Sequence, residues 1–170
     1  MKKSDIKIMP MYFEKYIELI EDIELTEALS KFSPDILDKE MLKNIGDKVY
    51  APDKWSVKEI IQHLIDSERV FNYRSLRFAR NDKTILPGYE ENEFAIQSKA
   101  NKRSIDDLLN EYKTARKSTI DLFKSFDDTM LQREGNCFSK DISVLALGFV
   151  MAGHLLHHSN VIKEKYMNLK

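Results

Sequence analysis

Cysteine, glycine and proline are all scarce in this sequence. A single cysteine, Cys137, occurs in 170 residues, so no disulfide can form within the chain. Proteins without disulfides are typical of a reducing compartment, and we expect a cytoplasmic location. Only five glycines and four prolines interrupt the chain, which leaves long segments free to be helical.

The sequence also lacks a strong net charge and a long apolar run. Its 27 basic residues nearly cancel its 28 acidic residues and give a net charge of −1. Because arginines and aromatic residues do not gather in one segment, we expect no nucleic-acid partner. The longest uncharged run, residues 142–162, contains three histidines, two serines and an asparagine. It is not the unbroken apolar stretch of about 18 residues that a membrane helix needs, so we expect no membrane partner.

Apolar residues recur at three- and four-residue spacing, which predicts an all-α fold. Ser56 and Ser104 are the predicted N-caps of two long helices, and Glu59 completes a capping box with Ser56. The long connections favour a four-helix bundle with crossover connections, formed as a single domain by residues 1–170. The helices are expected at about residues 11–29, 56–80, 104–126 and 141–167, with loops at 33–54, 81–94 and 126–143.

Three of the four histidines lie in the stretch GHLLHHSN, residues 153–160, of the last predicted helix. Each helical residue advances by about 100°, so His154 and His158 share one face, which also carries apolar residues. His157 follows a less apolar line and is expected at the rim, although a pair of His154 with His157 is a geometric alternative. His63 lies towards the edge of the apolar face of the second predicted helix.

These histidines are open to two interpretations. A single core-facing histidine is usually a hydrogen-bonded packing residue. A pair one turn apart, joined by a histidine from another helix, instead forms the three-nitrogen arrangement that binds a zinc, nickel or similar ion and leaves a coordination position open. Spacing alone does not decide between packing and metal binding.

Four separated blocks of the sequence resemble the DinB/YfiT-like metalloproteins, and especially the YfiT branch. They are YAPDKWSVKEIIQHLIDSERVFNYRSLRFARND, LPGYEENEF, EYKTARKSTIDLF and GFVMAGHLLHHSNVIKEKY, and they cover the chain from about residue 50 to its end. The resemblance implies a four-helix bundle with a three-histidine metal site. The family's ligands fall on His63, His154 and His158. His157 matches an extra histidine that is frequent in the family, and the resemblance does not imply that it is a ligand.

The resemblance also implies a pocket at one end of the bundle, covered by the long connections. Tyr89 and Phe94 either line this pocket or pack the loop down. Asp66 can orient an imidazole by accepting its second N–H, whereas Glu68 is expected on the surface.

Two further features of the sequence are candidates for function. Arg74, Arg77 and Arg80 form a ladder that either reaches an anionic substrate or pairs with Asp66 or Glu111. Cys137 is a competing nucleophile, because a cysteine near a histidine can carry covalent catalysis.

The function expected from the resemblance is that of a divalent-metal-dependent enzyme, with zinc or nickel as the ion. Members of the family join a small thiol such as bacillithiol to electrophilic compounds, and the YfiT branch has been called a metal-dependent hydrolase. We expect thiol transfer, with a small-molecule thiol and an electrophile as substrates and a homodimer as the assembly. Hydrolysis by metal-activated water and a non-catalytic metal-binding or stress-related interaction protein are the alternatives, and no catalytic side chain is assigned.

Overall fold

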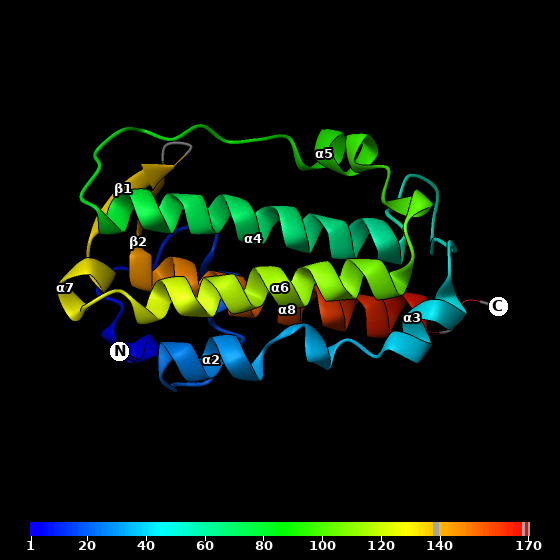
Figure 1. Cartoon of the computed structure of the whole chain (residues 1–170), viewed down its shortest axis with the longest axis horizontal. Helices are drawn as coiled ribbons and strands as arrows, with labels where there is room; N and C mark the ends of the chain where they lie inside the picture. Colours follow the sequence, from blue (N-terminus) through cyan, green and yellow to red (C-terminus); the bar gives the residue numbers. More distant parts are fainter. Residues whose placement is uncertain (138–139, 168, 170) are drawn as a thin grey trace.

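Three long helices run side by side in the computed structural model, which describes residues 1–137, 140–167 and 169. They are α4 (Val57–Ala79), α6 (Ile105–Lys124) and α8 (Val144–Tyr166). The fourth side of the bundle is built from short pieces, chiefly α2 (Leu25–Lys31) and α3 (Lys39–Ile45), as Figure 1 shows. The prediction of an all-α four-helix bundle is therefore confirmed, with one long helix replaced by shorter ones.

Local capping signals set the starts of the long helices. The Ser56 hydroxyl accepts a hydrogen bond from the Glu59 N–H at 3.2 Å, and the Glu59 carboxylate accepts one from the Ser56 N–H at 2.7 Å. At the starts of α6 and α8, the hydroxyls of Ser104 and Ser143 each accept one hydrogen bond, from the N–H groups of Asp107 and Ala146. Each cap satisfies backbone donors that have no partner within their own helix, so the predicted boundaries of these helices agree closely with the observed ones.

The helix predicted at residues 11–29 is wrong, because the chain opens between α1 (Glu14–Ile17) and α2. Residues at the N-terminus hydrogen-bond to the opened segment. The Met1 carbonyl accepts from the Leu25 N–H at 2.9 Å, and the Asp22 carboxylate accepts from the Ser4 N–H at 2.8 Å. These non-local bonds replace helical ones, and no local pattern in the sequence indicates them.

The predicted loops contain more regular structure than expected. The first loop contains α3, and α5 (Glu91–Ser98) begins within the second loop and extends beyond it, where no helix is predicted. The third loop contains α7 (Asp128–Leu131) and a short antiparallel hairpin of β1 (Glu134–Cys137) and β2 (Lys140–Ser143), in which Glu134 faces Ser143. Three single turns of 3-10 helix complete the described elements, at Lys3–Asp5, Pro34–Ile36 and Ala100–Lys102.

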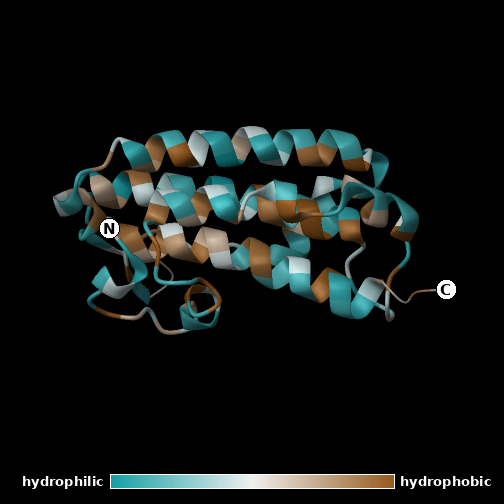
Figure 2. Cartoon of the chain, turned by 90° about the horizontal axis from the view of Figure 1, so that it is seen from below, coloured by the Kyte–Doolittle hydropathy of each residue, from teal (hydrophilic) through white to brown (hydrophobic). Residues whose placement is uncertain are grey.

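Helix α8 is the central helix of the core. Its residues from Val144 to Leu155 are all buried, and it packs against α1, α2 and α4. Apolar and polar residues alternate along the long helices in Figure 2, which is the pattern of helices that bury one side. By length and composition α8 could also cross a membrane, but most of its apolar window is buried within the protein.

A buried ion pair joins the helices near the middle of the bundle. The Arg116 guanidinium donates to both carboxylate oxygens of Glu68, at 2.6 and 2.8 Å, and each side chain is only 2% exposed. The remaining donors of Arg116 reach the carbonyl oxygens of Leu29, Phe32 and Met151. Burial alone would lower the pKa of Arg116, but the adjacent Glu68 charge raises it. The prediction that Glu68 lies on the surface is wrong.

Arg116→Met will lower the free energy of unfolding by about 3–5 kcal/mol, because it leaves the Glu68 charge buried without a partner. Lys117→Met, which removes an exposed pair with Asp121 on the same helix, is the control and will cost about 0.5 kcal/mol or less. Urea unfolding followed by circular dichroism measures both. Equal, small losses in the two variants would contradict this role for the buried pair.

Candidate metal centre

Three imidazole rings converge where α4 packs against α8. The Nε2 atom of His154 lies 3.1 Å from Nε2 of His63 and 3.1 Å from Nε2 of His158. His63 and His154 are only 4% and 6% exposed, and His158 is partly buried. The predicted trio of His63, His154 and His158 is thus brought together from two helices.

The separation of these nitrogen atoms fits a shared metal ion. Bonds of about 2.0–2.1 Å to one ion, at octahedral or tetrahedral angles, place neighbouring ligand nitrogens roughly 2.9–3.4 Å apart. Hydrogen bonding explains the cluster less well. A neutral imidazole Nε2 has either one hydrogen or one lone pair, so Nε2 of His154 cannot form good hydrogen bonds to both neighbours. One divalent ion satisfies all three lone pairs.

Burial keeps all three rings neutral at physiological pH. It lowers the pKa of His63 to about 4 and, with the neighbouring histidines, the pKa of His158 to about 3. The pKa of His154 is held well below its usual value, first by burial and then by His158 and His63. A neutral imidazole is the form that offers a lone pair to a metal.

Aromatic rings enclose the cluster. The ring centroid of Trp55 lies 4.8 Å from that of His63, and those of Tyr16 and Phe71 lie 5.1 and 6.3 Å from that of His154. None of these three residues is predicted from the sequence as part of the site. Trp55 lies eight residues before His63 in the same quoted block, which is a usable signal, but nothing local places Tyr16 of α1 beside α8.

Gly153 allows α1 to approach this part of α8. A Cβ atom at this position would lie 1.9 Å from the carbonyl oxygen of Tyr16, which no side chain can tolerate without a movement of the backbone. The glycine next to His154 therefore lets the backbone of α1 lie directly on α8, which holds the Tyr16 ring against the imidazole.

His157 lies at the rim, the position predicted for it. Its side chain is partly buried, and its ring centroid lies 5.1 Å from that of His158 and 5.3 Å from that of Tyr16. His157 and His158 both line a cavity of about 290 Å³ that also borders Trp55. This cavity gives the histidine cluster an open side.

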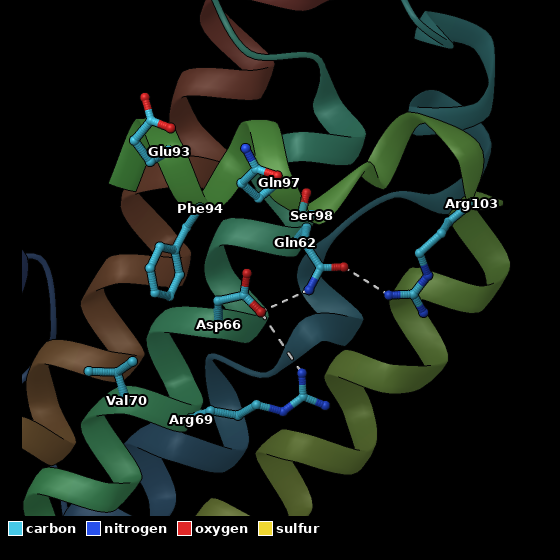
Figure 3. A pocket seen from close by; sticks show the side chains of 9 residues that line it. All are labelled: Gln62, Asp66, Arg69, Val70, Glu93, Phe94, Gln97, Ser98 and Arg103. Carbon is cyan, nitrogen blue, oxygen red and sulfur yellow. Dashed lines mark hydrogen bonds and ion pairs between the residues drawn. The ribbon is translucent and has the colours of Figure 1, made fainter. Parts of the chain in front are cut away.

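Asp66 does not contact an imidazole among the described residues. Its carboxylate accepts a hydrogen bond from Gln62 at 2.9 Å and lies 3.9 Å from Arg69, while Gln62 accepts from Arg103 (Figure 3). These groups line a cavity of about 650 Å³ between α4 and α5, which is distinct from the cavity at His158. The expected orienting role of Asp66 has no support in this geometry.

Tyr89 lies beside a third cavity, of about 340 Å³. Its hydroxyl is 2.8 Å from the Ser67 hydroxyl, and its ring packs against Phe94 with centroids 4.8 Å apart. Phe71 lines the same cavity, so Tyr89 is on a pocket wall near the histidines rather than in contact with them.

Cys137 is a poor candidate for a nucleophile. The thiol is buried, and burial raises its pKa, so it stays protonated at neutral pH. It borders the cavity of Tyr89 and does not belong to the histidine cluster. The interpretation of Cys137 as a competing nucleophile loses its chemical basis.

The arginine ladder does not form the ion pairs expected for it. Arg77 pairs with Asp82, Arg80 contacts the sulfur of Met130, and Arg74 donates to the Pro87 carbonyl. The expected acceptors, Asp66 and Glu111, are instead occupied by the arginines at positions 69 and 103.

The fold and the cluster together define a helical-bundle protein with three converging imidazoles that can hold a metal. The sequence profile of the DinB superfamily matches residues 10–162. The chain therefore belongs to the DinB superfamily.

A solved structure shares the fold. YfiT from Bacillus subtilis, described as a probable metal-dependent hydrolase with an unusual four-helix bundle topology, superposes with a TM-score of 0.64. The two chains are 18% identical, and the match covers 89% of this chain and 84% of YfiT. A comparison with curated proteins finds no match.

In the presence of a chelator, the protein will lose stability between pH 7 and pH 5. The folded pKa of His63 is about 4 and its unfolded value is about 6.5, so the unfolded chain binds a proton that the folded chain does not. The contribution of His63 is complete above about pH 6.5 and is lost as the pH falls towards 4, which amounts to about 2 kcal/mol at pH 5. His158 and His154, whose pKa values are also lowered, add to the loss in the same direction. Urea unfolding at both pH values measures it.

His63→Gln is the comparison for this pH dependence. Because the variant lacks the titrating ring, the difference between its unfolding free energies at pH 7 and pH 5 will be smaller by about the same amount. An identical pH dependence in the two proteins would show that His63 does not titrate as its burial requires.

Proposed function

We propose that this protein is a divalent-metal-dependent enzyme that transfers a low-molecular-weight thiol to an electrophilic small molecule. The proposal rests on one observation: three neutral imidazoles converge beside an open cavity. Nε2 of His154 lies 3.1 Å from Nε2 of each of the other two rings. Three protein ligands with a free position are typical of catalytic rather than structural metal sites. We propose zinc or nickel as the ion, because imidazole ligands suit both.

A divalent ion held by His63, His154 and His158 would supply a Lewis acid that lowers the pKa of a coordinated thiol or water. The chain's own residues orient the site and exclude water. Trp55 and Phe71 restrict access to the imidazoles from the sides, and the cavity at His157 and His158 leaves a path for substrate.

Thiol transfer suits this site better than hydrolysis. A hydrolase is helped by a general base near the attacking water. In the described part of the chain no carboxylate belongs to the cluster of three imidazoles, and Asp66 is engaged by Gln62. Asp53 lines the cavity at His158 but forms no hydrogen bond to these imidazoles. A thiolate needs no such base once its proton has been lost.

Metal-dependent hydrolysis is the second candidate. It is favoured by the shared fold with YfiT, which is itself described as a probable metal-dependent hydrolase. Metal binding without catalysis is the third. The homodimer and the cytoplasmic location stay predictions from the sequence.

His154→Ala will remove most of the bound metal, because the Nε2 atom of His154 is the one closest to both other ligands. Elemental analysis after purification and dialysis gives the metal-to-protein ratio, which we expect to fall from about one to near zero. His157→Ala, which removes the rim histidine, is the control and will keep its metal. Equal metal content in both variants would rule out the proposed ligand set.

The metal-loaded protein will consume bacillithiol in the presence of 1-chloro-2,4-dinitrobenzene. A carbon–sulfur bond forms, chloride leaves, and the thiol proton passes to solvent. Absorbance of the thioether product and loss of free thiol measure the reaction, with the chelated protein and His154→Ala as controls. Turnover of esters or amides without thiol loss would instead establish the hydrolase, and no turnover of either would favour the non-catalytic alternative.

A further inference from the structure

We propose that Arg74 binds a carboxylate of the substrate, in the cavity beside the histidine cluster. The ligand class is a small monocarboxylate with an apolar or aromatic body. The part of this inference that links the cavity to turnover rests on the proposed function, whereas binding of the carboxylate does not.

Arg74 is a buried cation whose charge is not neutralised. Its side chain is only 6% exposed, and its one hydrogen bond to a described residue runs from Nη2 to the Pro87 carbonyl at 2.9 Å. No carboxylate among residues 1–137, 140–167 and 169 pairs with it. The other buried arginine, Arg116, has a carboxylate and three carbonyls as partners. A buried guanidinium without a counter-ion is costly, and an anionic ligand removes that cost.

The cavity that Arg74 borders suits an apolar body attached to the anion. Its volume is about 340 Å³, and its walls include the rings of Phe13, Phe71 and Tyr89. The Arg74 guanidinium lies 5.9 Å from the centroid of Phe71, so one wall is shared by the charged and the aromatic parts. Lys140 lines the same cavity and adds a second positive charge. Together these groups provide an anion site next to a slot for a ring or a short alkyl chain.

The cavity lies close to the proposed site of chemistry. Phe71 borders the cavity with one side and lies 6.3 Å from the ring centroid of His154. Asn92 lines both this cavity and the one that reaches His158. A molecule anchored at Arg74 can therefore extend towards the histidines, which makes Arg74 a residue that determines specificity rather than a catalytic one.

Acidic residues limit the charge of the ligand. Glu90 and Glu91 also line this cavity, and both are exposed. They are screened by solvent, but they disfavour a multiply charged anion such as phosphate at the entrance. A single carboxylate meets less repulsion, so the site is expected to prefer monoanions.

The test is the binding of 3-phenylpropionate and of its uncharged analogue 3-phenylpropanol, measured by calorimetry on the full chain. We expect the acid to bind at least tenfold more tightly than the alcohol. Arg74→Gln will abolish this preference, Arg74→Lys will keep part of it, and Arg80→Gln, an exposed arginine of the same region, will leave it unchanged. Contacts from the phenyl protons to Phe71 and Tyr89, observed by NMR in the unmutated protein, test the location even if Arg74→Gln does not fold.

Equal affinity for acid and alcohol, an unchanged preference in Arg74→Gln, or phenyl contacts elsewhere would overturn the proposal. The same binding measured in His154→Ala separates this inference from the proposed function. If His154→Ala still binds 3-phenylpropionate, and if this binding depends on Arg74, the carboxylate site is supported whatever reaction the histidines perform.

Kinetics with matched substrates identify which substrate carries the carboxylate. N-acetylcysteine is compared with N-acetylcysteamine, and 4-chloro-3,5-dinitrobenzoate with 1-chloro-2,4-dinitrobenzene. Arg74→Gln will raise KM at least tenfold for the carboxylate member of one pair, with little change in kcat. A rise for the thiol pair assigns the site to the thiol, and a rise for the other pair assigns it to the electrophile. Unchanged KM values for both, in a protein that turns over, would overturn the role in substrate recognition.

Discussion

The ion pair between Glu68 and Arg116 is the interaction on which the arrangement of the bundle depends. Arg116 has five N–H donors, and the structure gives all of them an acceptor: two carboxylate oxygens of α4, two carbonyls at the end of α2 and one carbonyl of α8. Thr119 adds a further hydrogen bond to Glu68 at 2.6 Å. Because all its hydrogen bonds are formed, the pair avoids the penalty of isolated buried charges. All of these bonds can form together only when the helices keep this relative position.

This relative position matters for the histidines, because α4 carries both Glu68 and His63 and α8 carries both Met151 and His154. Glu68 lies five residues after His63 on α4, and Met151 lies three residues before His154 on α8. At about 1.5 Å per residue, the polar contact is within two turns of the imidazoles on each helix. A slide or rotation of α4 against α8 would break the Arg116 bonds before it separated the rings far. The buried pair thus helps to fix the separation of 3.1 Å on which metal binding depends.

The parts of this structure that could be predicted are those with local signals. Serine caps and apolar periodicity located α4 and α6, apolar periodicity located α8, and the one-turn spacing of His154 and His158 placed them on a shared face. The parts that could not be predicted depend on distant contacts. The break between α1 and α2 is caused by hydrogen bonds to the N-terminus, and the burial of Glu68 depends on Arg116, which is far away in the sequence. Helix α5 buries only Ala95 and therefore has no apolar stripe to reveal it.

Because Gly153 has no side chain, residues near the start of the chain can pack beside the histidine cluster. Tyr16 can lie on α8 beside His154 only because nothing projects from the neighbouring position. The segment before α2 is therefore part of the wall around the imidazoles, and a larger residue at position 153 would push Tyr16 away from His154.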